Sequence, residues 1–151
     1  MEGSLIAKNP SAGRDFHLTE TLEAGIELKG SEVKSLRAHQ ASLRGAFARV
    51  EREEVWLYGL EISPYAQAGP TAPESNRVRK LLLRRIQIRH LDAHVSRKGY
   101  VIVPTKLYFK GSLVKVELAL GRGKQAADKR ETIKRRESDR EIERALKQRN
   151  R

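Results

Sequence analysis

The sequence has no cysteine, 5% aromatic residues and no long hydrophobic segment. Without cysteine there can be no disulfide bonds and no zinc sites built on thiolates. The stretch over residues 63–73 carries no charge, but it is interrupted by prolines and is far shorter than the ~20 apolar residues of a membrane-spanning helix. The first ten residues also lack the basic segment and apolar run of a secretory signal. We therefore expect a cytoplasmic protein without a membrane segment.

Positive charge is what the chain has in excess. It carries 31 Lys or Arg against 19 Asp or Glu, a net charge of +12 over 151 residues. The 38% of hydrophobic residues is enough for one core, and the length is that of one domain. A folded domain with this charge is expected to bind an anionic partner.

The excess charge falls into two segments. Residues 122–151 carry twelve Lys or Arg and six Asp or Glu, which gives the same net charge of +6 as residues 1–121. Between Arg77 and Arg89 there are six basic residues and no acidic one. Two basic segments in one small chain favour nucleic-acid binding over a merely solvated surface. A membrane-surface protein is disfavoured because the carboxy-terminal segment lacks a broad apolar face.

Alternating apolar, β-branched and aromatic residues predict several short strands. The predicted strands cover residues 16–22, 26–28, 46–50, 55–62, 80–83, 100–109 and 113–118. Pro104 indicates an edge or a bulge in its strand. Two short helices are expected, one capped by Ser31 and one over 88–95 that ends at Gly99. The pattern predicts a mainly β fold with flanking helices, arranged as a small antiparallel barrel.

The chain is predicted to have three regions. Residues 1–13 are short of apolar residues and are expected to form a loose amino-terminal arm, and residues 14–121 form the β-barrel domain. Residues 122–151 form a basic tail, which follows a flexible step at Gly121. Favourable and unfavourable charge pairs at helical spacing nearly cancel in this tail. We expect the tail to be disordered when free and helical when bound to a polyanion.

The sequence offers little catalytic chemistry. His90 and His94 stand four residues apart on a predicted helix, a spacing that metal ligands use. The other two histidines, His17 and His39, are not placed to supply a third ligand, so no metal site is expected. There is no Gly-x-Ser-x-Gly motif, and the segment before Lys124 lacks the first glycine of a phosphate-binding loop. We expect a binding protein that is not an enzyme and needs no cofactor.

Several ordered blocks resemble one bacterial family, small protein B, the SsrA-binding or tmRNA-binding proteins. The resemblance begins with EAGI at 23–26 and GSEVKSLR at 30–37. Further blocks are ISPY at 62–65, RKLLL at 79–83, VPTKLYFK at 103–110, KVELA at 115–119, DKRE at 128–131 and REIERALK at 140–147. Their order and spacing match the family from about residue 9 to the end of the chain.

The resemblance implies a fold and a function. The fold is an OB-like closed antiparallel β-barrel with helices packed on it and a basic carboxy-terminal tail. The function is to bind the tRNA-like domain of tmRNA and to deliver it, with elongation factor Tu and alanyl-tmRNA, to stalled ribosomes in trans-translation. The tail would occupy the empty mRNA channel and the decoding region of the small subunit, so that the nascent chain is tagged for degradation and the ribosome is released. A monomer is expected.

The resemblance also implies two sets of binding residues. Those for tmRNA are Phe16, Glu23, Arg79, Lys80, Leu82, Arg84 and Lys124. Those for the ribosome lie in the tail and are Asp128, Lys129, Arg130, Lys134, Arg135, Arg140 and Arg144. From the residues alone, Glu23 could instead be an ion pair at a strand end, and Leu82 could instead pack in the core.

The chain departs from the family pattern at several of these places. Phe16 stands where the family usually has tyrosine, which keeps stacking and loses the hydroxyl. Arg84 stands where histidine or asparagine is common, which could replace a hydrogen bond with a phosphate contact. Ala127 replaces an aromatic residue or histidine, which removes base stacking there.

Three other functions compete with tmRNA binding. A generic OB-fold protein would stack single-stranded bases on aromatic residues along a groove. A structural protein of the ribosome would be present on every ribosome, whereas a rescue factor would be present on few. An enzyme would show turnover that one substitution abolishes.

Overall fold

The computed structural model describes residues 4–65, 69–70 and 72–124, with the side chains of residues 97 and 98 left aside. The strands are β1 (Leu5–Lys8), β2 (Phe16–Ile26), β3 (Ala41–Ser42), β4 (Phe47–Glu51), β5 (Glu54–Tyr58), β6 (Glu61–Ile62), β7 (Arg79–Leu82), β8 (Val101–Lys110) and β9 (Leu113–Gly123). The helices are α1 (Ala12–Asp15), α2 (Gly30–Arg37) and α3 (Arg85–Lys98). The predicted mainly β fold with a few helices is confirmed.

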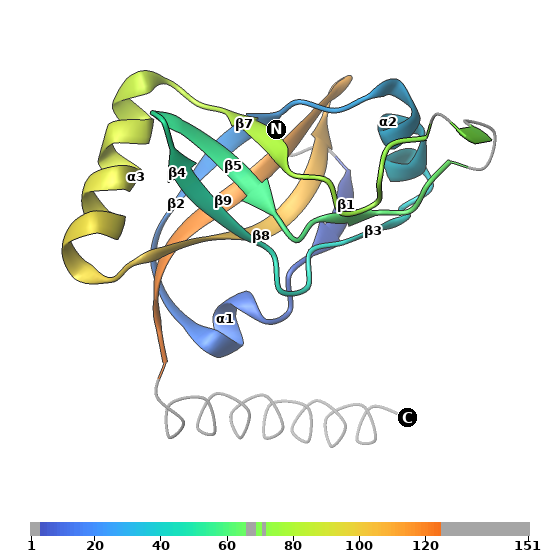
Figure 1. Cartoon of the computed structure of the whole chain (residues 1–151). Coiled ribbons are helices and arrows are strands. Elements are labelled where there is room, and N and C mark those ends of the chain that lie inside the picture. The colour runs from blue at the N-terminus through green and yellow to red at the C-terminus, as the bar shows by residue number, and fades with distance from the viewer. Residues whose placement is uncertain (1–3, 66–68, 71, 125–151) are drawn as a thin grey trace, which may run out of the picture.

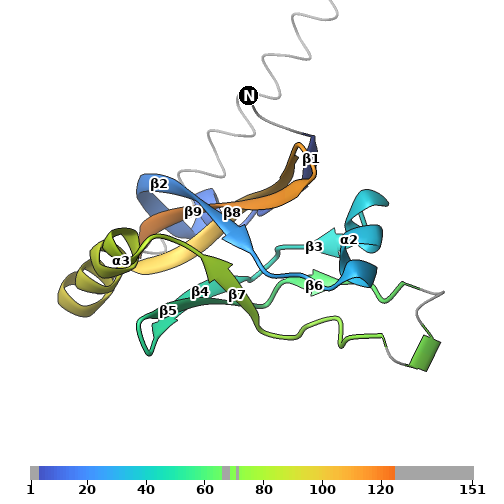
Figure 2. The same cartoon turned by 90° about the horizontal axis from the view of Figure 1, so that it is seen from above.

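Seven strands form one antiparallel sheet in the order β1-β8-β4-β5-β7-β2-β9. Because β9 also pairs with β8, the hydrogen-bonded neighbours from β8 through to β9 lead back to β8, and β1 pairs with β8 beside them. A second, two-stranded sheet joins β3 to β6. The longer helices α2 and α3 lie at opposite ends of the sheet (Figures 1 and 2). Within the described ranges, none of the helices is long and apolar enough to cross a membrane.

The core lies on the inner face of the strands. Val55 and Leu57 of β5 are fully buried and alternate with half-buried residues, which is the period-two pattern of a strand with one face in the core. Leu36 of α2 and Leu91 of α3 are also fully buried, so each helix contributes to the same core. Burying a leucine side chain stabilises a fold by roughly 1.5–3 kcal/mol.

Some predicted features are confirmed in detail. The register of β8 against β9 shifts between Pro104 and Lys106, which is the bulge that the proline indicated. Gly99 ends α3 with a φ of 66°, the left-handed conformation that favours glycine. The cap predicted at Ser31 was wrong by two residues, because α2 begins at Gly30 after Lys29, whose amide donates to Glu32 (2.9 Å).

The residue pattern predicted separate strands over residues 16–22 and 26–28, and the predicted gap between them is wrong. Strand β2 runs without interruption through Gly25, which pairs with Leu82 of β7. A side chain at Gly25 would meet the Leu82 Cβ at 3.2 Å. Any larger residue at position 25 would make Leu82 shift by a few tenths of an ångström, so the glycine fits the close approach of Leu82 and does not end the strand.

The expectation of a loose arm over residues 1–13 is corrected in the part of the arm that the structure describes. Strand β1 pairs with β8, and the buried side chain of Asn9 donates to the Pro104 carbonyl (2.9 Å). The expected flexible step at Gly121 is corrected too. Residues 121–123 belong to β9 and pair with residues 16–18 of β2, so that the two ends of the domain lie together.

Candidate nucleic-acid interface

Strand β7 presents one leucine to the core and the next to solvent. Leu81 is 1% exposed, whereas Leu82 is 47% exposed. Pairing with β2 decides which side chains of β7 face the core, since Leu82 lies opposite Gly25 and Leu81 lies opposite Ile26. Leu82 therefore does not pack in the core, which was the alternative left open by the sequence, and it offers an apolar surface to a ligand.

Leu82 lies between two hollows. One, of about 340 Å³, has Arg52, Lys80 and Arg85 in its lining together with the acidic Glu53 and Glu54. The other, wide open and about 580 Å³, is lined by residues that include Glu23, Arg84 and Lys115. The hollows hold basic residues from β7, β9, α3 and the β4–β5 turn, and an exposed leucine separates them. Such a surface can place an apolar contact between two phosphate sites.

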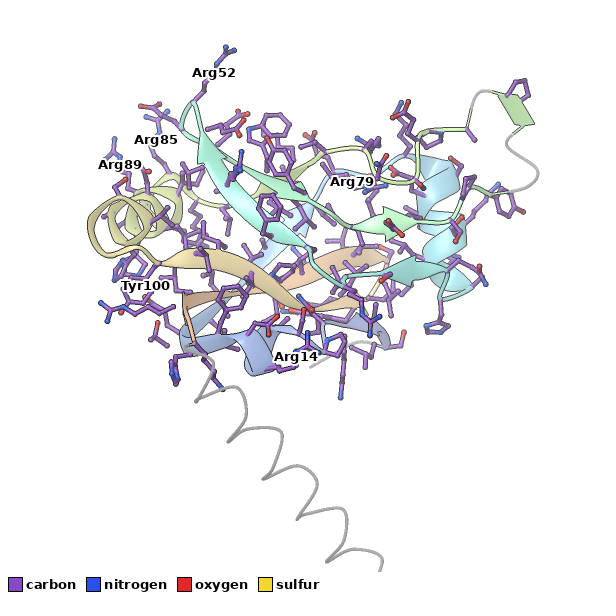
Figure 3. The ribbon with its side chains drawn as sticks, turned by 60° about the horizontal axis from the view of Figure 1, so that its bottom comes forward. Arg14, Arg52, Arg79, Arg85, Arg89 and Tyr100 are labelled. Carbon is purple, nitrogen blue, oxygen red and sulfur yellow. The ribbon has the colours of Figure 1, made fainter. Side chains whose placement is uncertain are left out.

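The amino-terminus of α3 adds to this positive field. The helix has no acidic residue in its first turn, where acids would offset the helix dipole, and it begins instead at exposed Arg84 and Arg85. Arg89 is exposed one turn later, and Arg52, Arg85 and Arg89 extend from the same end of the molecule (Figure 3). Without a ligand, these positive charges are repelled by the positive end of the helix dipole and destabilise the helix. A bound phosphate would pair with the arginines and would also interact favourably with the dipole.

Glu23 is held as an anion in the wider hollow. The Tyr108 hydroxyl donates to its carboxylate, and the Lys110 ammonium lies 3.2 Å away. The hydrogen bond from Tyr108, followed by that from Lys110, lowers the pKa of Glu23 despite the opposing effect of burial. The ion-pair alternative is thus realised, and the carboxylate still lines the hollow, where it can accept from a ribose hydroxyl or a base amino group.

Arg79 was predicted to bind RNA, and the structure corrects this. Its side chain is fully buried, and it forms an ion pair with buried Glu32 at 2.6 Å. The carbonyls of Leu60 (2.7 Å), Ser75 (3.0 Å) and Arg77 (3.0 Å) accept its remaining donors. Figure 3 shows Arg79 inside the molecule, away from the other labelled arginines. The guanidinium is therefore a structural clamp with no surface for a ligand.

Lys80 remains at the surface, although it is paired. Its ammonium lies 3.0 Å from the Glu54 carboxylate, and this hydrogen bond raises the pKa of Lys80. A phosphate would have to compete with Glu54 for this ammonium.

Phe16 and Lys124 lie apart from the two hollows beside Leu82. Phe16 packs against Ala12, Val103 and Ala119, and it lines a separate, mostly apolar cleft of about 490 Å³. The Lys124 ammonium donates to the Gly13 carbonyl (2.9 Å), and its amide donates to the Asp15 carbonyl (2.8 Å). Lys124 thus fixes the end of β9 to α1.

An aromatic and basic row on the outer face of β4 and β5 was missed by sequence reasoning. Phe47 and Tyr58 are stacked with ring centroids 5.3 Å apart, and Arg49 lies over both rings. Arg49 is opposite Trp56, which is opposite Lys80 on β7. The alternation within each strand was visible in the sequence, but only the register brings these side chains together. Interleaved aromatic and basic side chains can stack bases and bind phosphates.

Two predicted groups have different outcomes. The tail residues Asp128, Lys129, Arg130, Lys134, Arg135, Arg140 and Arg144 lie outside the described residues. For His90 and His94 the structure shows a third side chain with a ligand atom that the sequence could not place, because Glu20 of β2 lies beside them.

Comparison with known proteins places the chain in a family. The sequence model described as "SmpB protein" matches residues 6–148. The chain belongs to the SmpB family. Similar relatives are the SsrA-binding protein of Halalkalibacterium halodurans, 48% identical over 99% of this chain and 97% of that protein, and that of Caldanaerobacter subterraneus subsp. tengcongensis, 50% identical over 97% of this chain and 93% of that protein. The resemblance to the family is thereby confirmed.

A solved SmpB structure supports the same assignment. It is described as "tmRNA-SmpB: a journey to the center of the bacterial ribosome". It superposes with a TM-score of 0.68 at 43% identity and covers 83% of this chain and 92% of that chain. The similarity therefore extends from sequence to fold.

Proposed function

We propose that this chain binds tmRNA through its tRNA-like domain and acts in trans-translation. Membership of the SmpB family supports the proposal, as do the relatives named for binding SsrA and the solved tmRNA–SmpB structure. The observation that carries it is the surface beside Leu82, where an exposed apolar side chain lies between two hollows that each contain basic residues, next to a helix amino-terminus with no acidic residue in its first turn.

The proposed fold is the OB-like closed barrel of the family. The return of the strand pairing from β9 to β8 supports closure. A closed barrel holds its outer face rigid, so the spacing of Leu82, Arg84 and Glu23 is preset before RNA binds. Preset spacing suits a structured RNA that is recognised by shape and backbone.

Residues of different chemistry bind different parts of the RNA in this proposal. Arg84, Arg85 and Arg89 contact phosphates, because they are exposed at the positive end of α3. Leu82 packs against a base or ribose, and Glu23 accepts a hydrogen bond from a ribose hydroxyl or base amino group. Arg79 supports this surface from inside by holding the start of β7.

The tail and the remaining partners complete the proposal. Asp128, Lys129, Arg130 and the basic residues that follow bind the decoding region and mRNA channel of the small subunit. Lys124, held to α1, sets the point from which the tail departs. The chain acts as a cytoplasmic monomer, delivers alanyl-tmRNA together with elongation factor Tu, and works as a binding protein without catalysis.

Sequencing of the RNA that co-purifies with the full chain from cells tests this function. One dominant tmRNA species is the expected result. A broad mixture of messages would contradict the proposal and favour a generic single-strand binder. Equal amounts of the protein and of ribosomes in the purified particles would favour a structural ribosomal protein.

A further inference from the structure

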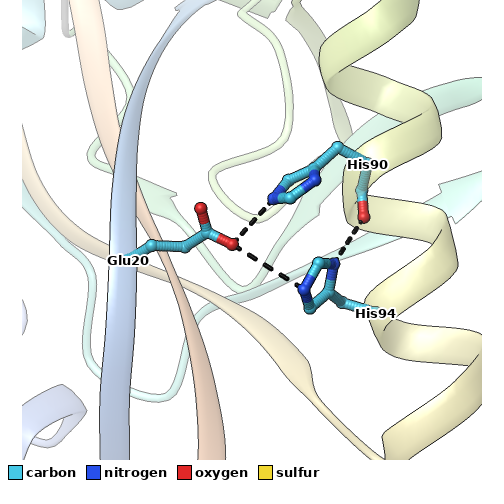
Figure 4. Close-up of side chains that lie close together, drawn as sticks. All are labelled: Glu20, His90 and His94. Carbon is cyan, nitrogen blue, oxygen red and sulfur yellow. Dashed lines mark hydrogen bonds and ion pairs between the residues drawn. The ribbon is translucent and has the colours of Figure 1, made fainter.

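Glu20, His90 and His94 converge at the surface between β2 and α3. The Glu20 Oε1 lies 2.7 Å from the His90 Nε2 and 3.9 Å from the His94 Nε2 (Figure 4). One ligand atom from each residue lies within 4.8 Å of the other two. In a tetrahedral zinc complex, with bonds of about 2.0–2.1 Å, ligand atoms are roughly 3.3 Å apart. The distances from the Glu20 Oε1 to the two histidine nitrogens, 2.7 and 3.9 Å, lie on either side of this value.

The backbone places these three side chains together. His90 and His94 are four residues apart on α3, so they lie on one face of the helix. The register of β2 against β9 shifts between Leu18 and Glu20, and such a bulge changes the direction of the side chains beside it. Figure 4 shows the Glu20 side chain pointing from β2 toward the two histidines of α3.

One hydrogen bond orients His94 for metal binding. Its Nδ1 lies 2.9 Å from the His90 carbonyl oxygen. A carbonyl oxygen can only accept, so Nδ1 donates this hydrogen bond and Nε2, on the side of Glu20, is the nitrogen left to bind a metal. Metal-bound histidines commonly have this second bond from the other ring nitrogen to a carbonyl. Tyr100 packs edge-on against the same ring at 5.6 Å and further restricts it.

We propose that Glu20, His90 and His94 form a binding site for a divalent transition metal, with Zn²⁺ as the ion it takes. Two imidazoles and one carboxylate suit zinc and its neighbours in the first row, whereas Mg²⁺ prefers oxygen ligands alone. The three side chains are between 33% and 48% exposed, so water or another anionic oxygen can occupy the fourth position. The ion replaces the direct hydrogen bond from His90 to Glu20.

Occupation of the site would join β2 to α3. This helix carries Arg85 and Arg89 and follows Arg84 at its cap, so the metal would hold the arginine-bearing helix against the strand that carries Glu23. The proposal concerns residues outside the hollows beside Leu82, and it does not depend on the proposed function. A metal-free ion pair between Glu20 and the histidines is the competing explanation.

The test is a Zn²⁺ titration of the full chain after metal removal, followed by calorimetry. We expect one saturable site per chain. Co²⁺ in place of Zn²⁺ should give the visible absorption of a low-symmetry site with nitrogen and oxygen ligands. Glu20→Gln, His90→Gln and His94→Gln should each weaken zinc affinity at least tenfold. Addition of Mg²⁺ should not displace the zinc.

Two matched controls use the remaining histidines of the chain. His17→Gln and His39→Asn should leave the affinity unchanged, and asparagine is chosen at position 39 because the backbone φ there is 56°. Thermal melting of every variant without metal verifies folding, and zinc should raise the melting temperature only when all three ligands are present. The absence of a one-to-one transition in the unmodified chain would overturn the proposal. Unchanged affinity in Glu20→Gln, or equal loss in the controls, would overturn it as well.

Discussion

Substitution of Glu32 by alanine should destabilise the fold strongly, because it removes the only carboxylate beside Arg79 that the structure shows. Both side chains are buried, at 2% and 0% exposure. After the substitution, three backbone carbonyls would remain as the acceptors of a fully buried guanidinium. Removing one partner from a buried ion pair costs about 3–5 kcal/mol. At about 2–4 °C per kcal/mol for a domain of this size, the melting temperature should fall by roughly 6–20 °C.

Urea unfolding measures this loss, and the neighbouring exposed pair provides the control. Glu54→Ala removes the partner of Lys80 at the surface and should shift the unfolding midpoint little. The double variant Glu32→Leu with Arg79→Met should be more stable than Glu32→Ala, because no buried charge is left unpaired. The clamp would be refuted if Glu32→Ala unfolded at the same midpoint as Glu54→Ala. It would also be refuted if Arg79→Met weakened RNA binding while stability stayed unchanged.

Four further outcomes are expected. Leu82→Ala should weaken tmRNA binding about tenfold in gel shifts without lowering stability, since the Leu82 side chain is half exposed. The control is Leu113→Ala, which replaces an exposed leucine in the β8–β9 hairpin and should change neither RNA binding nor stability. Arg84→Ala should reduce the slope of log K against log salt by about one unit if it contacts a phosphate, and an unchanged slope would exclude that contact. Burial opposes ionisation of Glu32, but the hydrogen bonds that the carboxylate accepts lower its pKa below 4.5. The contribution of the ionised carboxylate to stability is therefore present above pH 4.5 and is lost as the pH falls through the lowered pKa. The urea midpoint of Glu32→Gln should accordingly fall less on acidification than that of the unmodified chain. Deletion of residues 125–151 should spare tmRNA binding and abolish tagging in a reconstituted translation system, and parallel loss of both activities would show that the tail belongs to the RNA-binding surface.

Local patterns predicted most of the elements and little of their pairing. The period of two identified β5 and β8, and Gly99 identified the end of α3, because those signals lie within a few neighbouring residues. The strand at 121–123 was missed because its partners are residues 16–18, about a hundred positions earlier. Considered by themselves, Gly121 and Gly123 indicate a flexible segment, and they become strand residues only because β2 pairs with them.

The candidate site shows the same limit for charged residues. Arg79 stands in a basic run that is typical of a surface, and its burial depends on Glu32, 47 residues away in the chain. Leu81 and Leu82 are identical neighbours, and only the register against β2 decides which faces solvent. Glu20, the third ligand of the proposed metal site, is 70 residues from His90 in the chain and follows a bulge that no local pattern indicates.

The double attachment of Lys124 has a mechanical consequence. Since both its amide and its ammonium are bonded to the α1 segment, the last described residue is clamped at two points. Two points of attachment fix both the position of Lys124 and the direction of the backbone there. Docking of the domain on RNA would therefore also fix where residue 124 lies and the direction in which β9 ends. A partner that binds beyond residue 124 would then be held to a point that the domain sets, through geometry alone.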